Sequence, residues 1–147
     1  MKLFAHISIL LILLFLFSCG NKNFTEVVVE QYDDGNPKVV QRTFVKKTHE
    51  AHVIEVHFYP DGALHMEGPI VKGNRHGQWR SWYADGVLWS EGWFEQGKRQ
   101  GKGIVYHPSG LKHIEGEYTN GEKSGIWQTW DETGTLISTV DFSSQPE

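Results

Sequence analysis

A 24-residue unit decides the fold, and its clearest copy, residues 79–102, reads WRSWYADGVLWSEGWFEQGKRQGK. Columns of glycines and of aromatic or apolar residues keep this step along the chain. They are Gly62, Gly86, Gly110 and Gly134; Gly73, Gly97 and Gly121; Gly77, Gly101 and Gly125; Phe58, Trp82, Tyr106 and Trp130; and Ile70, Phe94, Tyr118 and Phe142. Self-similarity at a fixed period indicates a stacked array in which each unit buries its apolar side chains against its neighbours.

Each unit has the pattern of a β-hairpin. Residues 78–83 and 87–95 are rich in aromatic and β-branched residues, which favour strands. Ala84-Asp85-Gly86 separates them, and Gln96-Gly97-Lys98 leads into the next unit. Glycine at each turn supplies the positive φ that tight hairpin connections require.

The turns set a register in which Trp82 lies opposite Leu88, and equivalent pairs in other copies form a continuous apolar stripe. Strict alternation then puts Gly92 and Phe94 on the same face as Leu88. The glycine column that contains Gly92 predicts room for a neighbouring aromatic ring or a sharp curl of the sheet. The opposite face is predicted to carry the tryptophans Trp79, Trp89, Trp93 and Trp127.

The N-terminus has the pattern of an export signal. Lys2 is followed by an apolar run, residues 3–17, which is shorter than the roughly 20 residues that span a bilayer. Leu16-Phe17-Ser18-Cys19 resembles a bacterial lipobox, which implies cleavage before Cys19 and acylation of its thiol and new N-terminus. Gly20 after that cysteine favours the outer membrane, facing the periplasm, if the host is Gram-negative. A plain secretory signal or an uncleaved anchor are the alternatives.

The expected organisation has five parts. They are a signal peptide at 1–18, a lipidated tether at 19–25, a degenerate first repeat with an insertion at 26–52, regular repeats at 53–142, and a polar tail at 143–147. Without Lys2, the 14 basic residues become 13 against 18 acidic residues, a net charge of −5 with histidine neutral. This balance argues against nucleic acid as a partner, because phosphate binding needs a basic surface.

Three segments resemble MORN repeats, whose core reads roughly G-x-aromatic-x-x-G-x-x-x-G followed by x and a glycine or an aromatic residue. They are residues 68–79, 92–103 and 116–127. The intervening elements, of the form Tyr/His-x-Asp/Ser-Gly, resemble a bacterial MORN variant often labelled as an antitoxin component. The resemblance covers residues 31–142.

This resemblance implies an all-β protein, an elongated single-layer antiparallel sheet of tandem hairpins. It also implies a non-catalytic protein-binding or scaffolding surface, with no cofactor, and a membrane contact through acylated Cys19. Two alternatives remain open: an antitoxin-like component that neutralises a protein toxin, and a module that binds membrane phospholipids. A small-molecule substrate is not expected.

Binding residues are predicted on two features of the array. The first is the set of tryptophans, of which Trp89 and Trp93 are the preferred anchors because rigid aromatic side chains dominate interface energetics. The second is a basic edge at one series of turns, opposite an acidic edge at the other, which suits an anionic partner. The predicted binding residues are Trp79, Trp89, Trp93, Trp127, Lys72, Arg75, Lys98 and Arg99. Polar turns that merely keep the array soluble are the alternative.

The eight histidines raise the question of a metal site. The predicted register puts His57 opposite His65, close enough to share an ion, although both also suit the surface of a strand. No nucleophile motif is present. Glu67, Glu91 and Glu115 recur with the repeat, so we expect them to be strand positions and not catalytic acids. The sequence therefore predicts no enzyme.

Overall fold

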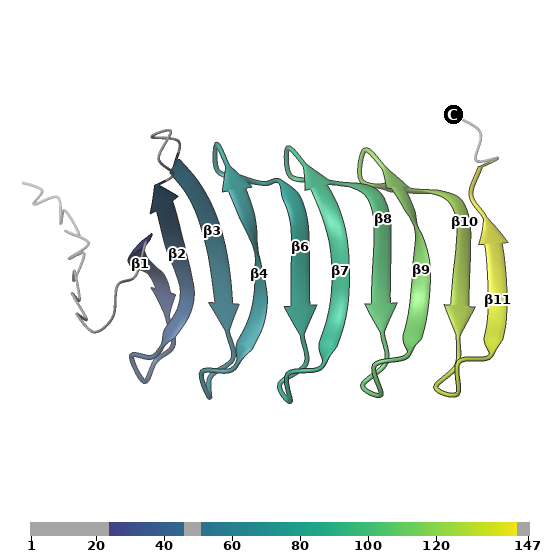
Figure 1. Cartoon of the computed structure of the whole chain (residues 1–147), viewed down its shortest axis with the longest axis horizontal. Coiled ribbons are helices and arrows are strands. Elements are labelled where there is room, and N and C mark those ends of the chain that lie inside the picture. Colours follow the sequence, from purple (N-terminus) through teal and green to yellow (C-terminus); the bar gives the residue numbers. More distant parts are fainter. Residues whose placement is uncertain (1–23, 46–50, 144–147) are drawn as a thin grey trace, which may run out of the picture.

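The protein forms one open antiparallel sheet whose strands follow one another in hairpin order, in a computed structural model that describes residues 24–45 and 51–143 (Figure 1). The predicted all-β array of tandem hairpins is therefore confirmed. The strands are β1 (Phe24–Gln31), β2 (Pro37–Val45), β3 (Ala51–Phe58), β4 (Leu64–Val71), β5 (Asn74–Arg75), β6 (Gly77–Trp82), β7 (Leu88–Glu95), β8 (Lys98–Tyr106), β9 (Lys112–Thr119), β10 (Glu122–Trp130) and β11 (Leu136–Asp141). Short β5 pairs with β4, ahead of β6.

The two series of turns lie on opposite long rims of the sheet, as predicted (Figure 1). The upper rim of that view holds the two-residue turns Lys72-Gly73, Gln96-Gly97 and Asn120-Gly121. Both residues of each turn have positive φ, for example 49° at Gln96 and 85° at Gly97, which is the type I′ geometry that matches strand twist. The lower rim holds longer turns, each closed by a glycine with positive φ, such as Gly86 with φ of 86°.

Acidic residues on the lower rim hold these turns in shape. Asp61 Oδ1 accepts a hydrogen bond of 3.0 Å from the Ala63 amide, and Asp85 Oδ1 accepts one of 3.1 Å from Val87. Asp131 Oδ1 accepts from the amides of Thr133 and Thr135. Side chains that bond the backbone two residues ahead stabilise turns, so the acidic character of this rim has a structural origin.

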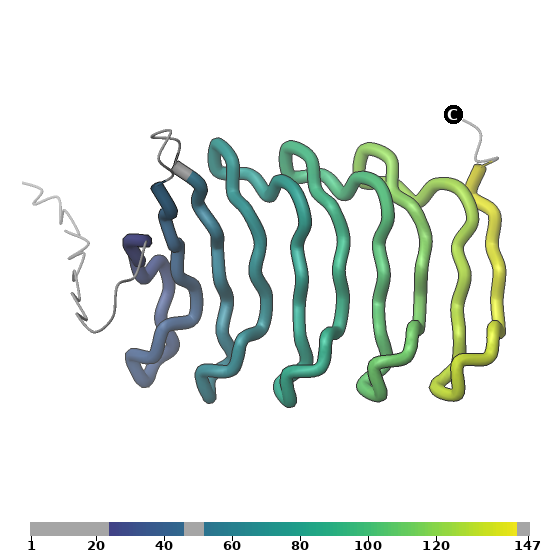
Figure 2. Tube along the Cα trace, viewed as in Figure 1, coloured from purple at the N-terminus to yellow at the C-terminus, as the bar shows by residue number. Residues whose placement is uncertain are grey.

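Each return strand carries one extra residue near the lower rim, which the strict alternation expected for these strands does not predict. Trp82 pairs with Leu88 as predicted, but Ser81 pairs with Ser90, so Trp89 has no partner of its own. The same shift recurs in every copy, and the trace repeats its path from hairpin to hairpin (Figure 2). A bulge of this kind moves every later side chain of the strand to the other face.

The predicted faces are therefore wrong beyond the bulge. Gly92 pairs with Trp79 and Phe94 with Gly77, so these residues share a face with Trp79 and not with Leu88. We call this the glycine face, after the column Gly68, Gly92 and Gly116. The other face, which we call the glutamate face, carries Trp82, Leu88, Trp93 and the column Glu67, Glu91 and Glu115.

Two indoles cover the glycine column, as its small side chains predicted. A Cβ atom at Gly68 would lie 2.3 Å from Trp79, and one at Gly116 would lie 2.2 Å from Trp127. Both indoles are buried, with 3% and 7% of their surface exposed. In the central copy the indole position is held by Gly103, and a Cβ at Gly92 would have no atom closer than 3.6 Å.

A row of side chains on the lower rim ties each copy to the next. The hydroxyl of Tyr59 donates to the Trp82 carbonyl at 2.9 Å, and that of Tyr83 donates to the Tyr106 carbonyl at 2.8 Å. His107 Nε2 continues the row with the Trp130 carbonyl at 2.9 Å. In the last copy Asp131 takes this position, and β11 is the last strand of the described residues.

The first strand starts earlier than predicted. Phe24 and Thr25, assigned to the tether, lie in β1, where the Phe24 and Phe44 rings pack with centroids 5.0 Å apart. The predicted signal peptide, Cys19 and residues 46–50 of the insertion lie outside the described residues. At the other end of the sheet, the Phe142 amide donates to the Gly125 carbonyl at 2.8 Å.

Candidate binding surface

A row of cations over aromatic rings runs along the glycine face, near the upper rim. It consists of Arg75, Arg99 and Lys123, which occupy one position of the 24-residue unit. We call these three residues the cation ladder. Arg99 pairs with Phe94, and Lys123 with Tyr118, so the ladder and the predicted aromatic column share one face.

Each cation lies against two rings. The Arg75 guanidinium carbon is 4.2 Å from the Trp79 centroid and 5.6 Å from Phe94. Lys123 Nζ lies 4.2 Å from the Trp127 centroid and 5.3 Å from that of Phe142. Contacts of this kind are worth about 0.5–1 kcal/mol at exposed sites.

Arg99 fills the place of the missing central indole. Its guanidinium carbon lies 5.3 Å from the Phe94 centroid and 5.1 Å from Tyr118, and its Nη1 is the atom nearest to the Cβ position of Gly92. The glycine pair Gly92 and Gly103 lies in the same part of the sheet. The cations therefore pack as part of the sheet and have defined positions.

Among the described residues, no carboxylate forms a salt bridge with any member of the cation ladder. The only acidic strand residue on the glycine face between residues 53 and 142 is Glu55, which already bonds Gln41 and His57. Burial lowers the pKa of the Arg75 guanidinium; Glu55 opposes this shift and the neighbouring Arg99 adds to it. The glycine face is thus positively charged.

The glutamate face has the opposite balance. Its strand carboxylates over the same range outnumber its cations. The carboxylates are Glu67, Glu91, Glu95, Glu115, Glu117, Glu122 and Asp141, and the cations are Arg80, Lys98, Lys102 and Lys112. The predicted contrast between two rims is therefore only part of the pattern, since the structure also separates charge between the two faces.

Two glutamates on this face are engaged by neighbouring strands. Glu91 Oε1 accepts a 2.8 Å hydrogen bond from the Tyr106 hydroxyl, and burial together with this bond raises the pKa of Tyr106 to about 12. Lys102 and Lys112 lie 2.8 and 2.6 Å from the Glu115 carboxylate. Burial alone would raise the pKa of Glu115, but the two ammonium groups outweigh it and lower the pKa. These glutamates therefore stabilise the sheet.

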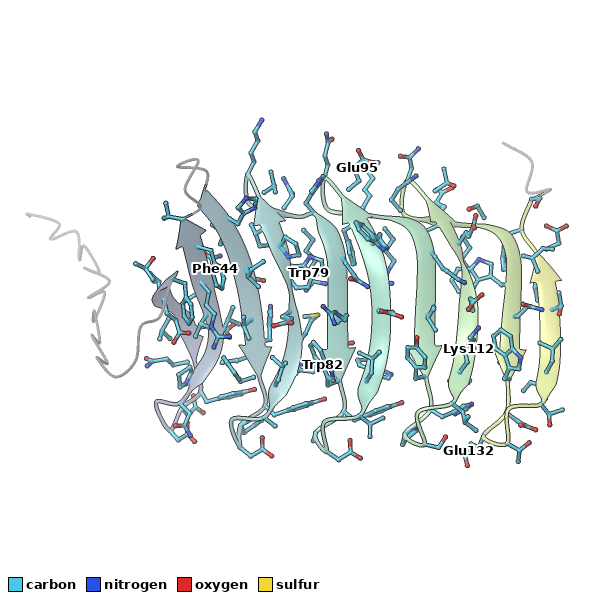
Figure 3. All side chains as sticks on the ribbon, in the orientation of Figure 1. Phe44, Trp79, Trp82, Glu95, Lys112 and Glu132 are labelled. Atoms are coloured by element: carbon cyan, nitrogen blue, oxygen red, sulfur yellow. The ribbon has the colours of Figure 1, made fainter. Side chains whose placement is uncertain are left out.

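The predicted binding residues fall into separate places. Trp79 and Trp127 are buried under the cation ladder and offer a partner little surface, whereas Trp89 and Trp93 are 41% and 54% exposed. Trp89 is the bulge residue and lies against Tyr83, with centroids 6.0 Å apart. Arg75 and Arg99 belong to the ladder, and Lys72 and Lys98 are exposed at upper-rim turns. Figure 3 shows Trp79 in the upper half of the sheet and Trp82 near the lower rim.

The predicted pairing of His57 with His65 is wrong. The bulge puts Met66 opposite His57, and the His65 ring lies on Tyr59 with centroids 4.4 Å apart. His57 Nε2 instead lies 2.9 Å from Glu55 Oε1. Within residues 24–45 and 51–143, no group of three or more potential ligand side chains is placed to hold a metal ion.

The first hairpin borders an open hollow of about 240 Å³ at the lower rim, lined by Val40, Phe58, Glu26, Asp61 and neighbouring residues. Its carboxylates are already occupied, since Glu26 bonds Arg42 at 2.7 Å and Asp61 holds its own turn. The hollow therefore has few free polar groups with which to orient a small molecule.

The fold and surface define a tandem-hairpin repeat protein with two accessible faces. No helix in the described part of the chain is long and apolar enough to cross a membrane. The sequence profile of the MORN repeat variant matches residues 75–98 and 123–143. These matches support the resemblance of the repeats to the MORN-repeat family. Repeats of that family are generally protein- or membrane-binding and typically non-enzymatic.

Both matched segments start at a ladder cation. The first contains the whole β6–β7 hairpin, and the second contains β11 and all of β10 except Glu122. The intervening copy, which starts at Arg99 and has Gly103 at the indole position, is not matched. Comparison of the whole chain with curated proteins gives no match.

Proposed function

We propose that this protein is a lipid-anchored component of the cell envelope whose open sheet binds another protein without catalysing a reaction. The observation that carries the proposal is a single sheet with two accessible faces of opposite charge. Large apolar side chains remain exposed on it, including Trp93 at 54%, Ile126 at 58% and Val140 at 46%. Exposed apolar groups beside fixed charges are typical of interaction surfaces.

The lipid anchor is supported by the lipobox-like Leu16-Phe17-Ser18-Cys19 and by the solitary cysteine. An anchor there would be followed by only four residues before β1 begins at Phe24, so the sheet would be held close to the membrane. Growth with labelled palmitate tests this part. Label in the wild-type protein and its loss in Cys19→Ser support acylation, whereas an unlabelled wild-type protein contradicts it.

Protein binding is tested by placing a photocrosslinking amino acid at single positions in intact cells. Trp93 samples the glutamate face, Val140 the glycine face, and Thr133 on the lower rim is the matched control. We expect a discrete crosslinked protein, identified by mass spectrometry, from at least one face and none from Thr133. Equal nonspecific background from all three positions would contradict a binding surface.

A further inference from the structure

We infer that the cation ladder of the glycine face recognises an extended acidic segment in the polyproline II conformation, with one carboxylate at every third residue. This inference rests on the proposed function, because such a segment would belong to the protein partner. It is carried by three features of the ladder: its charges, its spacing and the rings beside it.

The positive charges of the ladder indicate an anionic ligand. Arg75, Arg99 and Lys123 form no salt bridge with a described residue, although the chain has 18 acidic residues. Packing against rings holds their stems in place, and Arg99 and Lys123 are exposed to solvent. Because these side chains are already ordered, binding a carboxylate costs less side-chain conformational entropy here than at a mobile surface lysine.

The spacing selects the shape of the ligand. Ladder cations lie two strand positions apart, and strands are about 4.7–4.9 Å apart, so the charges recur about every 9.4–9.8 Å. A polyproline II helix has three residues per turn and rises about 3.1 Å per residue, so every third side chain returns to one side after about 9.3 Å. A β-strand repeats its side after about 6.6–6.8 Å and does not match. Seven residues would therefore reach all three cations.

The rings suit the residues between the carboxylates. Phe94, Tyr118 and Phe142 are half-buried and alternate with the cations along the same line. Aromatic-lined surfaces are the usual docking sites for proline-rich segments, whose preformed helix loses little entropy on binding. At the centre of this line, Arg99 lies over Gly92 and the Tyr118 ring lies over Gly103, so a cation and a ring are presented side by side.

The test is a binding titration of the purified full-length protein with a fluorescent peptide of four Glu-Pro-Pro repeats. One control peptide has the same number of glutamates at every second position, and another replaces each glutamate by lysine. We expect saturable binding of the first peptide that weakens with salt, weaker binding of the second and none of the third. Equal affinity for the two glutamate peptides would overturn the match in spacing.

Variants then locate the site. Arg99→Gln should weaken binding about two- to fivefold, in the range of an exposed ion pair, and the triple variant with Arg75→Gln and Lys123→Gln by tenfold or more. Arg80→Gln on the glutamate face is the matched control and should leave affinity unchanged. Arg99→Lys should retain most of the binding, and circular dichroism confirms that each variant is folded.

Other outcomes separate the possibilities. Absence of peptide binding, or an equal loss of affinity in Arg80→Gln, would overturn the inference. The proposed function would still be tested independently by the crosslinks at Trp93 and Val140. Binding to anionic phospholipid vesicles that is lost in the ladder variants, without peptide binding, would assign the ladder to a membrane and also overturn it.

Discussion

Replacing Gly116 with alanine tests how the indoles cover the glycine column. A Cβ atom at Gly116 would lie 2.2 Å from the Trp127 ring, far inside van der Waals contact. The same change at Gly92 is the matched control, because its nearest neighbour would be the flexible end of Arg99 at 3.6 Å. Neither glycine has a positive φ, so backbone strain does not contribute.

The two substitutions should have opposite effects on stability. In Gly116→Ala the Trp127 indole must move, which costs about 1–3 kcal/mol as overpacking. Complete loss of its buried position, where Nε1 donates to the Glu117 carbonyl at 3.1 Å, sets an upper range of about 3–5 kcal/mol. In Gly92→Ala nothing is displaced, and alanine in a strand is favoured over glycine by roughly 0.5–1 kcal/mol.

Urea unfolding followed by tryptophan fluorescence measures both changes. We expect a lower midpoint for Gly116→Ala and an unchanged or higher midpoint for Gly92→Ala, with similar slopes. Equal destabilisation by both substitutions would refute the reasoning, because it would mean that the central copy is packed like its neighbours. A neutral Gly116→Ala would show that no indole lies on that glycine.

Three further predictions concern the other contacts. Tyr83→Phe removes the bond to the next copy and should cost about 1 kcal/mol, whereas Tyr118→Phe, whose hydroxyl has no hydrogen bond among the described residues, should cost less in the same unfolding experiment. In a spectrophotometric titration Tyr106 should ionise at about pH 12, and Glu91→Gln should lower this pKa. The stabilising effect of the protonated Tyr106 hydroxyl on the folded state is present below about pH 10 and is lost as the pH rises towards 12. Because the two lysines lower the pKa of Glu115, the contribution of its carboxylate to the free energy of unfolding should be complete at neutral pH and should decline as the solution is acidified through the folded pKa. NMR titration of Lys102→Met should show a higher Glu115 pKa.

The repeat period predicted the hairpins, their turns and the pairs at the lower end of each strand. Trp82 with Leu88, Phe58 with Leu64 and Trp130 with Leu136 are partners as expected. These features depend on residues that are close in sequence and on turns whose positions are marked by glycine. The 24-residue period is therefore sufficient to predict most of the strand order and pairing.

The bulge could not be predicted in the same way. It recurs at positions such as His65 and Trp89, so it leaves the period unchanged, and alternation of residue types does not reveal an unpaired residue. Its consequence is large, because it brings Gly92 to the face of Trp79 and gathers the cations on that side. The tyrosine contacts were missed for a different reason: the Tyr59 and Tyr83 column was visible, but its acceptors are backbone carbonyls, which no residue type indicates.

The separation of charge between two faces depends on this bulge, and a disulfide test measures the register directly. In a background with Cys19→Ser, one variant carries Ser81→Cys with Ser90→Cys, and the other carries Ser81→Cys with Trp89→Cys. The serine hydroxyls lie 2.6 Å apart on paired residues. Mild oxidation followed by alkylation and mass spectrometry should show a crosslink in the first variant and free thiols in the second. A crosslink only in the second variant would mean that the strands alternate without interruption, and it would contradict the two faces described above.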